Sequence, residues 1–192
     1  MATLTDQEIK IIPIFSDFKI ESTNSPKKNG QFVISEYSEK SMHGSFLPYE
    51  EAKHYKRAAV SGIVIAKDGI LIARRSETVD QYPDFFECAP SGGLCQEDFE
   101  AQLYQELEEE VRFGIKDIER SFLLFLIEDV KANTVDICSL IKMQEFFKPI
   151  VNKEYVDAQW IYLDELSSYS YQHRQEFVPT SLVLIEKAKE ML

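Results

Sequence analysis

The sequence has few cysteines, no long hydrophobic run and no excess of basic residues. Its three cysteines, Cys88, Cys95 and Cys138, form no C-x-x-C pair. This odd number favours a reducing compartment over a disulfide framework. The N-terminus lacks a basic segment followed by an apolar one, and no apolar stretch approaches the roughly 18 residues of a membrane span. We therefore expect a cytoplasmic protein with no membrane partner.

Positive charge is also scarce. The 192 residues include 33 acidic and 21 basic side chains, which gives a formal net charge of −12. A chain this acidic has no general attraction for nucleic acid or for an anionic membrane. We expect no nucleic acid partner, and an anionic ligand would need local Arg or Lys side chains or a bound cation.

The chain divides into an N-terminal extension, residues 1–57, and a main domain, residues 58–192. Hydrophobic residues make up 44% of the sequence, which is typical of a globular protein. The extension contains the polar, turn-rich stretch 22–31 and an alternating segment at 32–37 that predicts a strand. It is too short and too poor in apolar residues for a core of its own.

The main domain begins with a clear hairpin pattern. The β-branched runs Val60–Ile65 and Ile70–Ala73 flank Lys67-Asp68-Gly69, and Asp-Gly is a strong turn signal. Further strands are predicted at 121–127, 134–143 and 158–163, and helices at 97–112, from 164 onward and at 179–192. This order predicts an α/β fold in which a mixed β-sheet carries helices on its faces.

The predicted helix that follows Glu97 is strongly acidic. It has no basic residue before Arg112, but seven acids: Glu97, Asp98, Glu100, Glu106, Glu108, Glu109 and Glu110. On a helical wheel Glu110 falls within the apolar arc, Glu106 at its edge and Glu109 beyond it. Carboxylates about 5 Å apart repel each other by roughly 3 kcal/mol at an effective dielectric of 20. Either these groups are a solvated helix face, or a shifted pKa or a hard cation such as Mg²⁺ offsets the repulsion.

The segment from Gly92-Gly93 through Glu97 to Gln105-Glu106-Leu107-Glu108-Glu109-Glu110 resembles the Nudix box. A hairpin ending in Arg74-Arg75-Ser76 precedes it, and Trp160 with Leu163-Asp164-Glu165-Leu166 resembles the closing strand and helix of Nudix domains. The resemblance covers residues 58–192 and implies a Nudix-type α/β/α sandwich with a mixed β-sheet.

This segment departs from the Nudix pattern at three points. The stretch from Gly93 to the helix is about two residues shorter than in the family. Gln105 stands where the family has an arginine that braces the glutamates. Arg112-Phe113-Gly114 closes the motif, whereas the family places a glycine two positions earlier. Loops can absorb the changes in length, but the loss of the arginine leaves weakened catalysis open.

The resemblance implies a metal site that holds Mg²⁺, with Mn²⁺ as the alternative ion. Glu106 and Glu110 would be ligands, and Glu109 a further ligand or a base. Glu97 would act through a second metal or a water, and the Gly93 region would offer a backbone carbonyl. The general base of many Nudix enzymes comes from a loop outside the box.

Glu154 is the best-placed general base, with Glu145 as a weaker alternative. The other interpretation of Glu154 is an ordinary exposed loop carboxylate. Arg74 or Arg75 would reach a substrate phosphate, unless both pair with acidic residues. Phe85, with Tyr82 and Phe86, would stack on a base, although aromatic residues beside a helix are more often part of the core.

The implied function is a metal-dependent hydrolase that cleaves the diphosphate bond of a nucleoside diphosphate linked to another moiety. A nucleotide sugar such as ADP-ribose is favoured, because the extension is similar in length to that of nucleotide-sugar members. The resemblance also implies a homodimer. The alternative, which Gln105 supports, is a Nudix-fold nucleotide-binding or regulatory module with weak or no catalysis.

Overall fold

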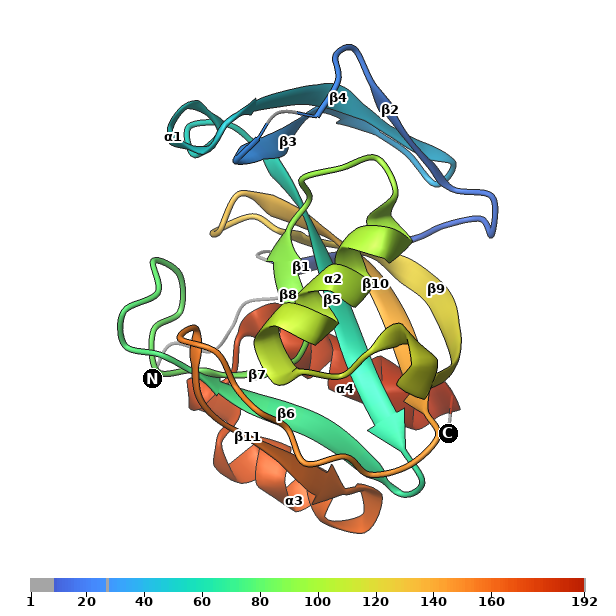
Figure 1. Cartoon of the computed structure of the whole chain (residues 1–192), viewed down its shortest axis with the longest axis vertical. Helices are drawn as coiled ribbons and strands as arrows, with labels where there is room; N and C mark the ends of the chain where they lie inside the picture. The colour runs from blue at the N-terminus through green and yellow to red at the C-terminus, as the bar shows by residue number, and fades with distance from the viewer. Residues whose placement is uncertain (1–8, 27, 192) are drawn as a thin grey trace.

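The structure is a computed structural model that describes residues 9–26 and 28–191 (Figure 1). Its strands are β1 (Ile9–Pro13), β2 (Lys19–Ser22), β3 (Gly30–Tyr37), β4 (Ser41–Pro48), β5 (Arg57–Ala66), β6 (Gly69–Arg75), β7 (Phe86–Cys88), β8 (Ser91–Gly93), β9 (Ile118–Asp129), β10 (Thr134–Met143) and β11 (Tyr155–Tyr162). The helices are α1 (Tyr49–Ala52), α2 (Phe99–Val111), α3 (Leu163–Gln172) and α4 (Pro179–Met191), with the short 3₁₀ turns η1 (Ile115–Asp117) and η2 (Arg174–Glu176).

All the strands belong to one mixed sheet whose main path is β1-β9-β10-β5-β3-β4-β2. The sheet forks at the hairpin of β5 and β6, which pair only at Ile65–Ile70 and Ala66–Gly69. Beyond that point β6 pairs with β7 and β11, whereas β5 pairs with β8 and runs parallel to β10. The two arms of the fork diverge toward the start of β5.

Helices cover both faces of the sheet, because the side chains of β5 alternate between them. Ala58, Val60 and Val64 belong to a core cluster that includes Leu103 and Leu107 of α2. Ile63 and Ile65 belong to a second cluster with side chains of α3 and α4, including Leu166, Leu184 and Ile185. Figure 1 shows α2 and α4 on opposite sides of β5 and β10. This arrangement confirms the predicted α/β sandwich.

The described part of the extension adds strands to this same sheet. β1 pairs with β9, and β3 pairs with β4. β3 also pairs with β5 at one position, where Val33 is opposite Arg57. The buried rings of Phe18, Phe32 and Phe46 complete the core on the α2 face. Residues 1–8 lie outside the described part of the chain, and the boundary at residue 57 stays a prediction.

Most predicted elements are present, with changes at their ends. The hairpin and the strands at 121–127, 134–143 and 158–163 correspond to β5–β6, β9, β10 and β11. The acidic helix begins at Phe99, after Asp98, whose side chain accepts a hydrogen bond of 2.9 Å from the Ala101 N–H. Glu97 therefore lies outside the helix. The predicted last helix corresponds to α4, and Leu192 lies outside the described residues. Of the short strands expected in the extension only β3 had been placed, and β7 and β8 were not predicted.

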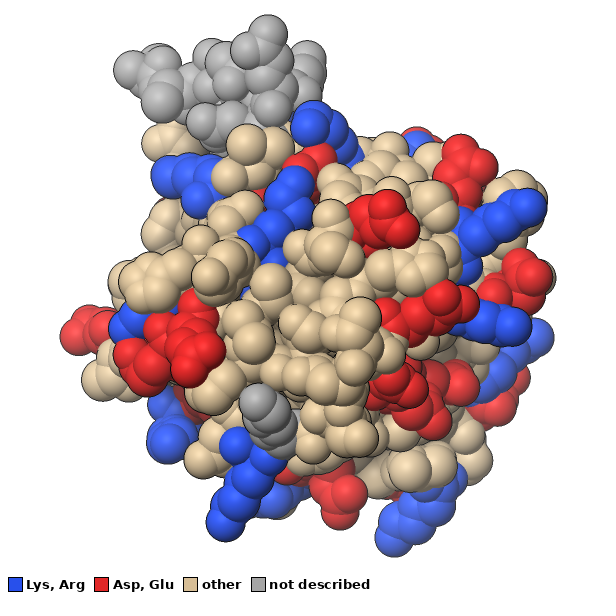
Figure 2. All heavy atoms as spheres, turned by 90° about the horizontal axis from the view of Figure 1, so that it is seen from above, with Lys and Arg blue, Asp and Glu red and all other residues tan. Residues whose placement is uncertain are grey.

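The surface carries both signs of charge. On the face shown in Figure 2, acidic and basic side chains are interspersed and no broad patch of one sign is present. In the described ranges, no helix is long and apolar enough to cross a membrane.

Candidate active site

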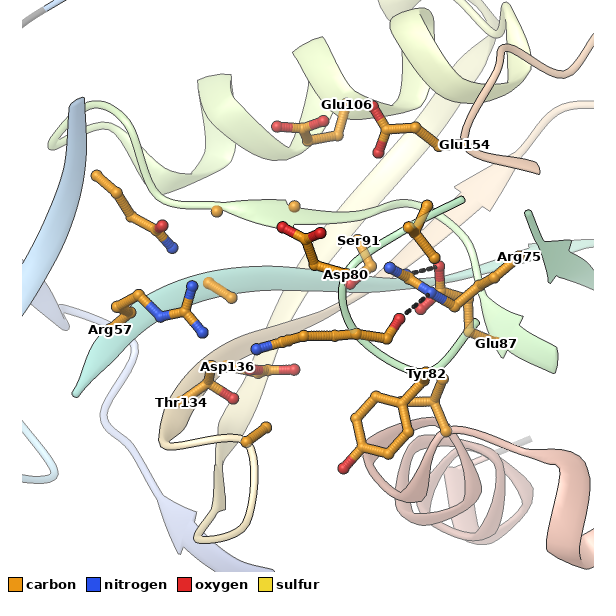
Figure 3. A pocket seen from close by; sticks show the side chains of 18 of the residues that line it. Arg57, Arg75, Asp80, Tyr82, Glu87, Ser91, Glu106, Thr134, Asp136 and Glu154 are labelled. Atoms are coloured by element: carbon orange, nitrogen blue, oxygen red, sulfur yellow. Dashed lines mark hydrogen bonds and ion pairs between the residues drawn. The ribbon is translucent and has the colours of Figure 1, made fainter. Parts of the chain in front are cut away.

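A cleft of about 810 Å³ opens between the two arms of the forked sheet (Figure 3). β5, β6, β7, β8 and β10 contribute lining residues, and so do α2, the 78–82 loop, the loop before β11 and the first residues of α4. Because these segments are far apart in the sequence, the fork of the sheet is what brings their polar side chains together.

Glu110 is the most buried carboxylate of α2, with a relative exposure of 2%. Its Oε2 accepts hydrogen bonds from the Ser91 N–H at 3.0 Å and from the Tyr155 hydroxyl at 3.2 Å. Burial raises the pKa of Glu110 well above its ordinary value, and repulsion from Glu87 and Glu106 raises it further. The helix thus places a carboxylate where its charge is strongly disfavoured.

Glu106 lies one turn earlier and lines the cleft. Its Oε1 accepts a 2.6 Å hydrogen bond from Gln102 Nε2. Burial raises the pKa of Glu106 to about 7. The backbone of Gly92 packs directly on this side chain, because a Cβ there would lie 2.4 Å from Glu106 Cδ. A larger residue at Gly92 would therefore displace the Glu106 side chain from its present position.

Neutral amides take the place of the family's arginine. Gln105 Nε2 donates a 2.8 Å hydrogen bond to Oε1 of Glu109, which is exposed and lines the cleft. Gln102 supports Glu106 in the same way, one turn apart along the helix. Each amide orients one carboxylate without adding a positive charge.

Glu154 lies in the exposed loop before β11 and also lines the cleft. Figure 3 shows the carboxylates of Glu106 and Glu154 next to each other at the same end of the cleft. Repulsion from Glu154 contributes to the raised pKa values of Glu106 and Glu110. Glu145, the weaker candidate for a base, is not among the residues that line the cleft.

The chemistry of these side chains fits a hard divalent cation. No ion pair neutralises Glu106, Glu109, Glu110 or Glu154 within the described ranges 9–26 and 28–191. Carboxylate oxygens that lack a basic partner are the ligands that Mg²⁺ and Mn²⁺ prefer. The described side chains form no ready-made group of three or more His, Cys, Asp or Glu ligands.

Four of the predicted site residues are not among those that line the cleft: the buried Glu110, and Glu97, Arg74 and Phe85. Glu97 is exposed, and its Oε1 accepts a 3.2 Å hydrogen bond from the Ser22 N–H. Arg74 forms an ion pair with Asp84, with Nε 2.7 Å from Oδ1, and its guanidinium stacks over Phe86. Phe85 packs on Tyr82, with ring centroids 5.6 Å apart, and does not line the cleft. Residues 74 and 75 point to opposite sides of β6 because side chains alternate along a strand.

Arg75 does line the cleft, but it is held by other groups. Its Nη1 donates a 2.5 Å hydrogen bond to the buried Glu87, and its Nε donates to the Gln81 carbonyl at 3.1 Å. Burial raises the pKa of Glu87, while Arg75 and the Tyr155 hydroxyl oppose that rise. Tyr155 also contacts Glu110, so a chain of hydrogen bonds joins Arg75 to the carboxylates of α2.

The other end of the cleft holds residues that the sequence analysis did not identify. Arg57 at the start of β5 is 8% exposed, and its Nε has no hydrogen-bond partner. The buried Asp136 of β10 accepts a 2.9 Å hydrogen bond from Ser61 Oγ, and burial raises its pKa to about 6. In the pairing of β10 with β5, Thr134 is opposite Arg57 and Asp136 is opposite Ala59. An aspartate within an otherwise apolar strand was the one available signal.

Comparisons with known proteins agree with this architecture. No protein-family model and no curated protein sequence matches the chain. Among solved structures, the DR0079 protein of Deinococcus radiodurans is similar with a TM-score of 0.63 and 16% identity, over 82% of this chain and 98% of that one.

Two further structures are similar over the main domain. The Nudix domain of Shewanella oneidensis NrtR, solved with ADP-ribose, has a TM-score of 0.51 and 17% identity over 70% of this chain and 86% of its own. A bifunctional NMN adenylyltransferase/ADP-ribose pyrophosphatase from Francisella tularensis, solved with AMP and a manganese ion, has a TM-score of 0.53 and 21% identity. That match covers 70% of this chain and 41% of the bifunctional one. The chain has the Nudix fold.

Proposed function

We propose that the protein is a metal-dependent hydrolase that cleaves the diphosphate bond of a nucleoside diphosphate linked to another moiety. The observation that carries this proposal is the pair Glu106 and Glu110, two carboxylates of α2 with raised pKa values and no basic partner among the described residues. Glu106 lines a cleft large enough for such a ligand, and Glu110 is buried one helical turn behind it.

Glu106, Glu109 and Glu110 would hold Mg²⁺ or Mn²⁺. Glu106 and Glu109 line the cleft, and the buried Glu110 lies one helical turn beyond Glu106, bonded to the N–H of the lining residue Ser91. The carbonyl of Gly93, which accepts a hydrogen bond from Cys95 Sγ at 3.3 Å, is a further candidate oxygen. A bound divalent ion supplies charge neutralisation at phosphate oxygens and lowers the pKa of a bound water. Glu97 does not line the cleft and is bonded to the Ser22 N–H, so it is left out of this set.

Glu154 would accept the proton of the attacking water. It lies beside Glu106 at the same end of the cleft but belongs to a different segment, the loop before β11. Glu109, which Gln105 holds in place, is the other candidate for this role. Arg75 would contribute positive charge to the wall of the cleft and, through Glu87 and Tyr155, would help to orient Glu110.

The substrate class is supported by fold similarity and by size. One similar structure holds ADP-ribose and another belongs to an ADP-ribose pyrophosphatase. The extension, whose described strands continue the main sheet, fits the longer nucleotide-sugar type of enzyme. ADP-ribose is therefore the first compound to test. A cytoplasmic location fits the three free thiols, and a homodimer remains part of this proposal.

A substrate panel tests the proposal directly. Purified protein with Mg²⁺ or Mn²⁺ would be incubated with nucleotide sugars, dinucleotides and nucleoside triphosphates, and the products separated by chromatography. Release of a nucleoside monophosphate from a diphosphate compound is expected. No turnover of any diphosphate compound with either ion contradicts the hydrolase.

The second candidate function is a nucleotide-binding or regulatory module without catalysis. Gln105 favours it, because an amide replaces the charged side chain of the Nudix pattern. Calorimetric titration with Mg²⁺ separates the two functions. Binding that is lost in Glu106→Gln supports a catalytic metal site, whereas nucleotide binding without any metal binding supports the module.

A further inference from the structure

Arg57 is a buried cation that forms no ion pair with any described residue. It is 8% exposed, its Nε has no hydrogen-bond partner, and none of the ion pairs in the described part of the chain involves it. The chain has 33 acidic residues that could have paired with it. An ionised group that is buried without a partner is costly for a folded protein. Such a group is retained where a ligand completes it.

The guanidinium of Arg57 points into the cleft from the end opposite Glu106 and Glu154 (Figure 3). Asp136 and Thr134 of the neighbouring strand lie beside it in the same view. The parallel register places Thr134 next to Arg57, and Asp136 follows two residues later on the same face of the sheet. One planar ligand can therefore contact both a donor fork and a carboxylate.

An anionic group would suit this end of the cleft poorly. Asp136 is buried, and the buried Asp129 lies close enough to raise the pKa of Asp136 by repulsion. A phosphate or carboxylate that approached Arg57 would be repelled by these two groups. A neutral ligand that offers hydrogen-bond acceptors to Arg57 and donors to Asp136 would satisfy both side chains.

Guanine has this pattern among the common bases. Its N7 and O6 are adjacent acceptors that an arginine fork binds, and its N1–H and N2–H₂ are adjacent donors that suit a carboxylate. Adenine presents an amino group next to N7 and would face the fork with a donor. We propose that Arg57 and Asp136 recognise guanine, so that the substrate is a guanosine diphosphate derivative.

This assignment rests on the proposed function, since it takes the cleft to hold a nucleoside diphosphate derivative. It keeps the nucleotide-sugar class and replaces the adenine of ADP-ribose by guanine. The base would lie at the Arg57 end of the cleft, and the diphosphate would lie near the carboxylates of α2.

Binding of nucleoside monophosphates without metal tests base recognition apart from catalysis. Calorimetry in the presence of a chelator would compare GMP, IMP and AMP. We expect GMP to bind roughly 10- to 100-fold more tightly than AMP, the range typical of a good bidentate contact. IMP, which keeps N7, O6 and N1–H but lacks the amino group, should bind with intermediate affinity.

Two variants of Arg57 and one control separate recognition from folding. Arg57→Met removes the charge, and Arg57→Lys keeps the charge but loses the planar fork. Both should weaken GMP and IMP binding while AMP binding is unchanged. Arg120→Met, at an exposed arginine of β9, is the matched control and should bind all three nucleotides as the unsubstituted protein does. Asp136→Asn should reduce the affinity for GMP more than that for IMP.

The results distinguish this assignment from the proposed function. Equal affinities for GMP and AMP, or an Arg57→Lys protein that keeps full GMP preference, overturn the assignment. Arg57-dependent GMP binding in a protein that hydrolyses no diphosphate supports the assignment and removes the hydrolase. Hydrolysis of adenine and guanine compounds at equal kcat/KM supports the hydrolase and overturns the assignment.

Discussion

The two ends of the cleft differ in the sign of the charged groups that form no ion pair. At the α2 end, Glu106 and Glu110 are carboxylates without a basic partner among the described residues. At the other end, Arg57 is a guanidinium that forms no ion pair with a described acidic residue, although Asp136 of the neighbouring strand is close to it. The carboxylates of α2 and the guanidinium of Arg57 thus stand apart and do not neutralise each other.

This separation supports the proposal that the cleft binds a ligand, since it does not favour stability. Buried charges that are left unpaired lower the free energy of unfolding, and proteins commonly accept such a cost at functional sites. The rest of the protein behaves differently: Glu128 is paired with Lys10 and Lys56, which contribute to lowering its pKa to about 2. Each end of the cleft can therefore be tested by removing its charge.

The largest expected effect is on turnover at the α2 end. Glu106→Gln and Glu110→Gln should each reduce kcat/KM by roughly 10²- to 10⁴-fold, because metal-derived stabilisation of the transition state is worth several kcal/mol. Steady-state kinetics with the best substrate of the panel would measure this. Glu108→Gln, at an exposed position of the same helix outside the cleft, is the control. An equal loss in the control would contradict a ligand role.

The next effect is on stability at the Arg57 end. Arg57→Met should raise the free energy of unfolding of the ligand-free protein by about 1–3 kcal/mol, since it replaces an uncompensated buried charge by an apolar chain of similar length. Urea denaturation would measure the change. A stability loss of similar size would mean that Arg57 is structural and that the comparison between the two ends fails.

A smaller effect concerns pH and metal at the α2 end. The pKa of Glu106 in the folded state, about 7, lies above the ordinary value of a glutamate, about 4.3. The folded state thus binds more protons between these values, and stability falls as pH rises through this window. From pH 6 to pH 8 the loss should be on the order of 1 kcal/mol without metal. Mg²⁺ favours the charged carboxylates, so the melting temperature should rise more on adding Mg²⁺ at pH 8 than at pH 6.

The smallest expected effect is on stability at Arg112, which lies outside both ends of the cleft. It serves as a control for the effects at the two ends. Arg112, where the Nudix pattern is interrupted, follows α2 in the left-handed conformation with φ 64°. Arg112→Gly should raise the free energy of unfolding by about 0.5–1 kcal/mol, because glycine adopts this conformation without strain. Arg112→Ala keeps the strain and should not stabilise. Turnover should be unchanged in both, as Arg112 does not line the cleft.

The α2 end was predictable because a helix has a fixed period. Once Leu107 and its apolar neighbours defined the buried face, the wheel placed Glu110 inside it and Glu106 at its edge, as the structure confirms. Glu108 and Gln105 were correctly placed outside it. The hairpin and the mixed sheet followed from turn chemistry and strand alternation in the same local way.

The Arg57 end was not predictable, because it depends on contacts between strands that are distant in the sequence. Arg57 stands in a polar stretch that is typical of an exposed strand start, and only the parallel pairing with Thr134 brings it beside Asp136. The sequence left Arg74 and Arg75 open for a related reason, since strand alternation says that the two side chains face opposite sides but not which one faces the cleft. Glu87 lies between Phe86 and Cys88 and gave no functional signal.

Because the sheet forks, the strand β5 sets the distance between the two ends of the cleft. Arg57 begins this strand, and three residues later Val60 is paired with Gly92, whose backbone packs on Glu106. At about 3.3 Å per residue these points are separated by roughly 10 Å along the strand. A compound that spans this interval can engage both ends at once, whereas a shorter one reaches only one. The fixed length of this buried strand thus favours compounds that are long enough to contact both ends.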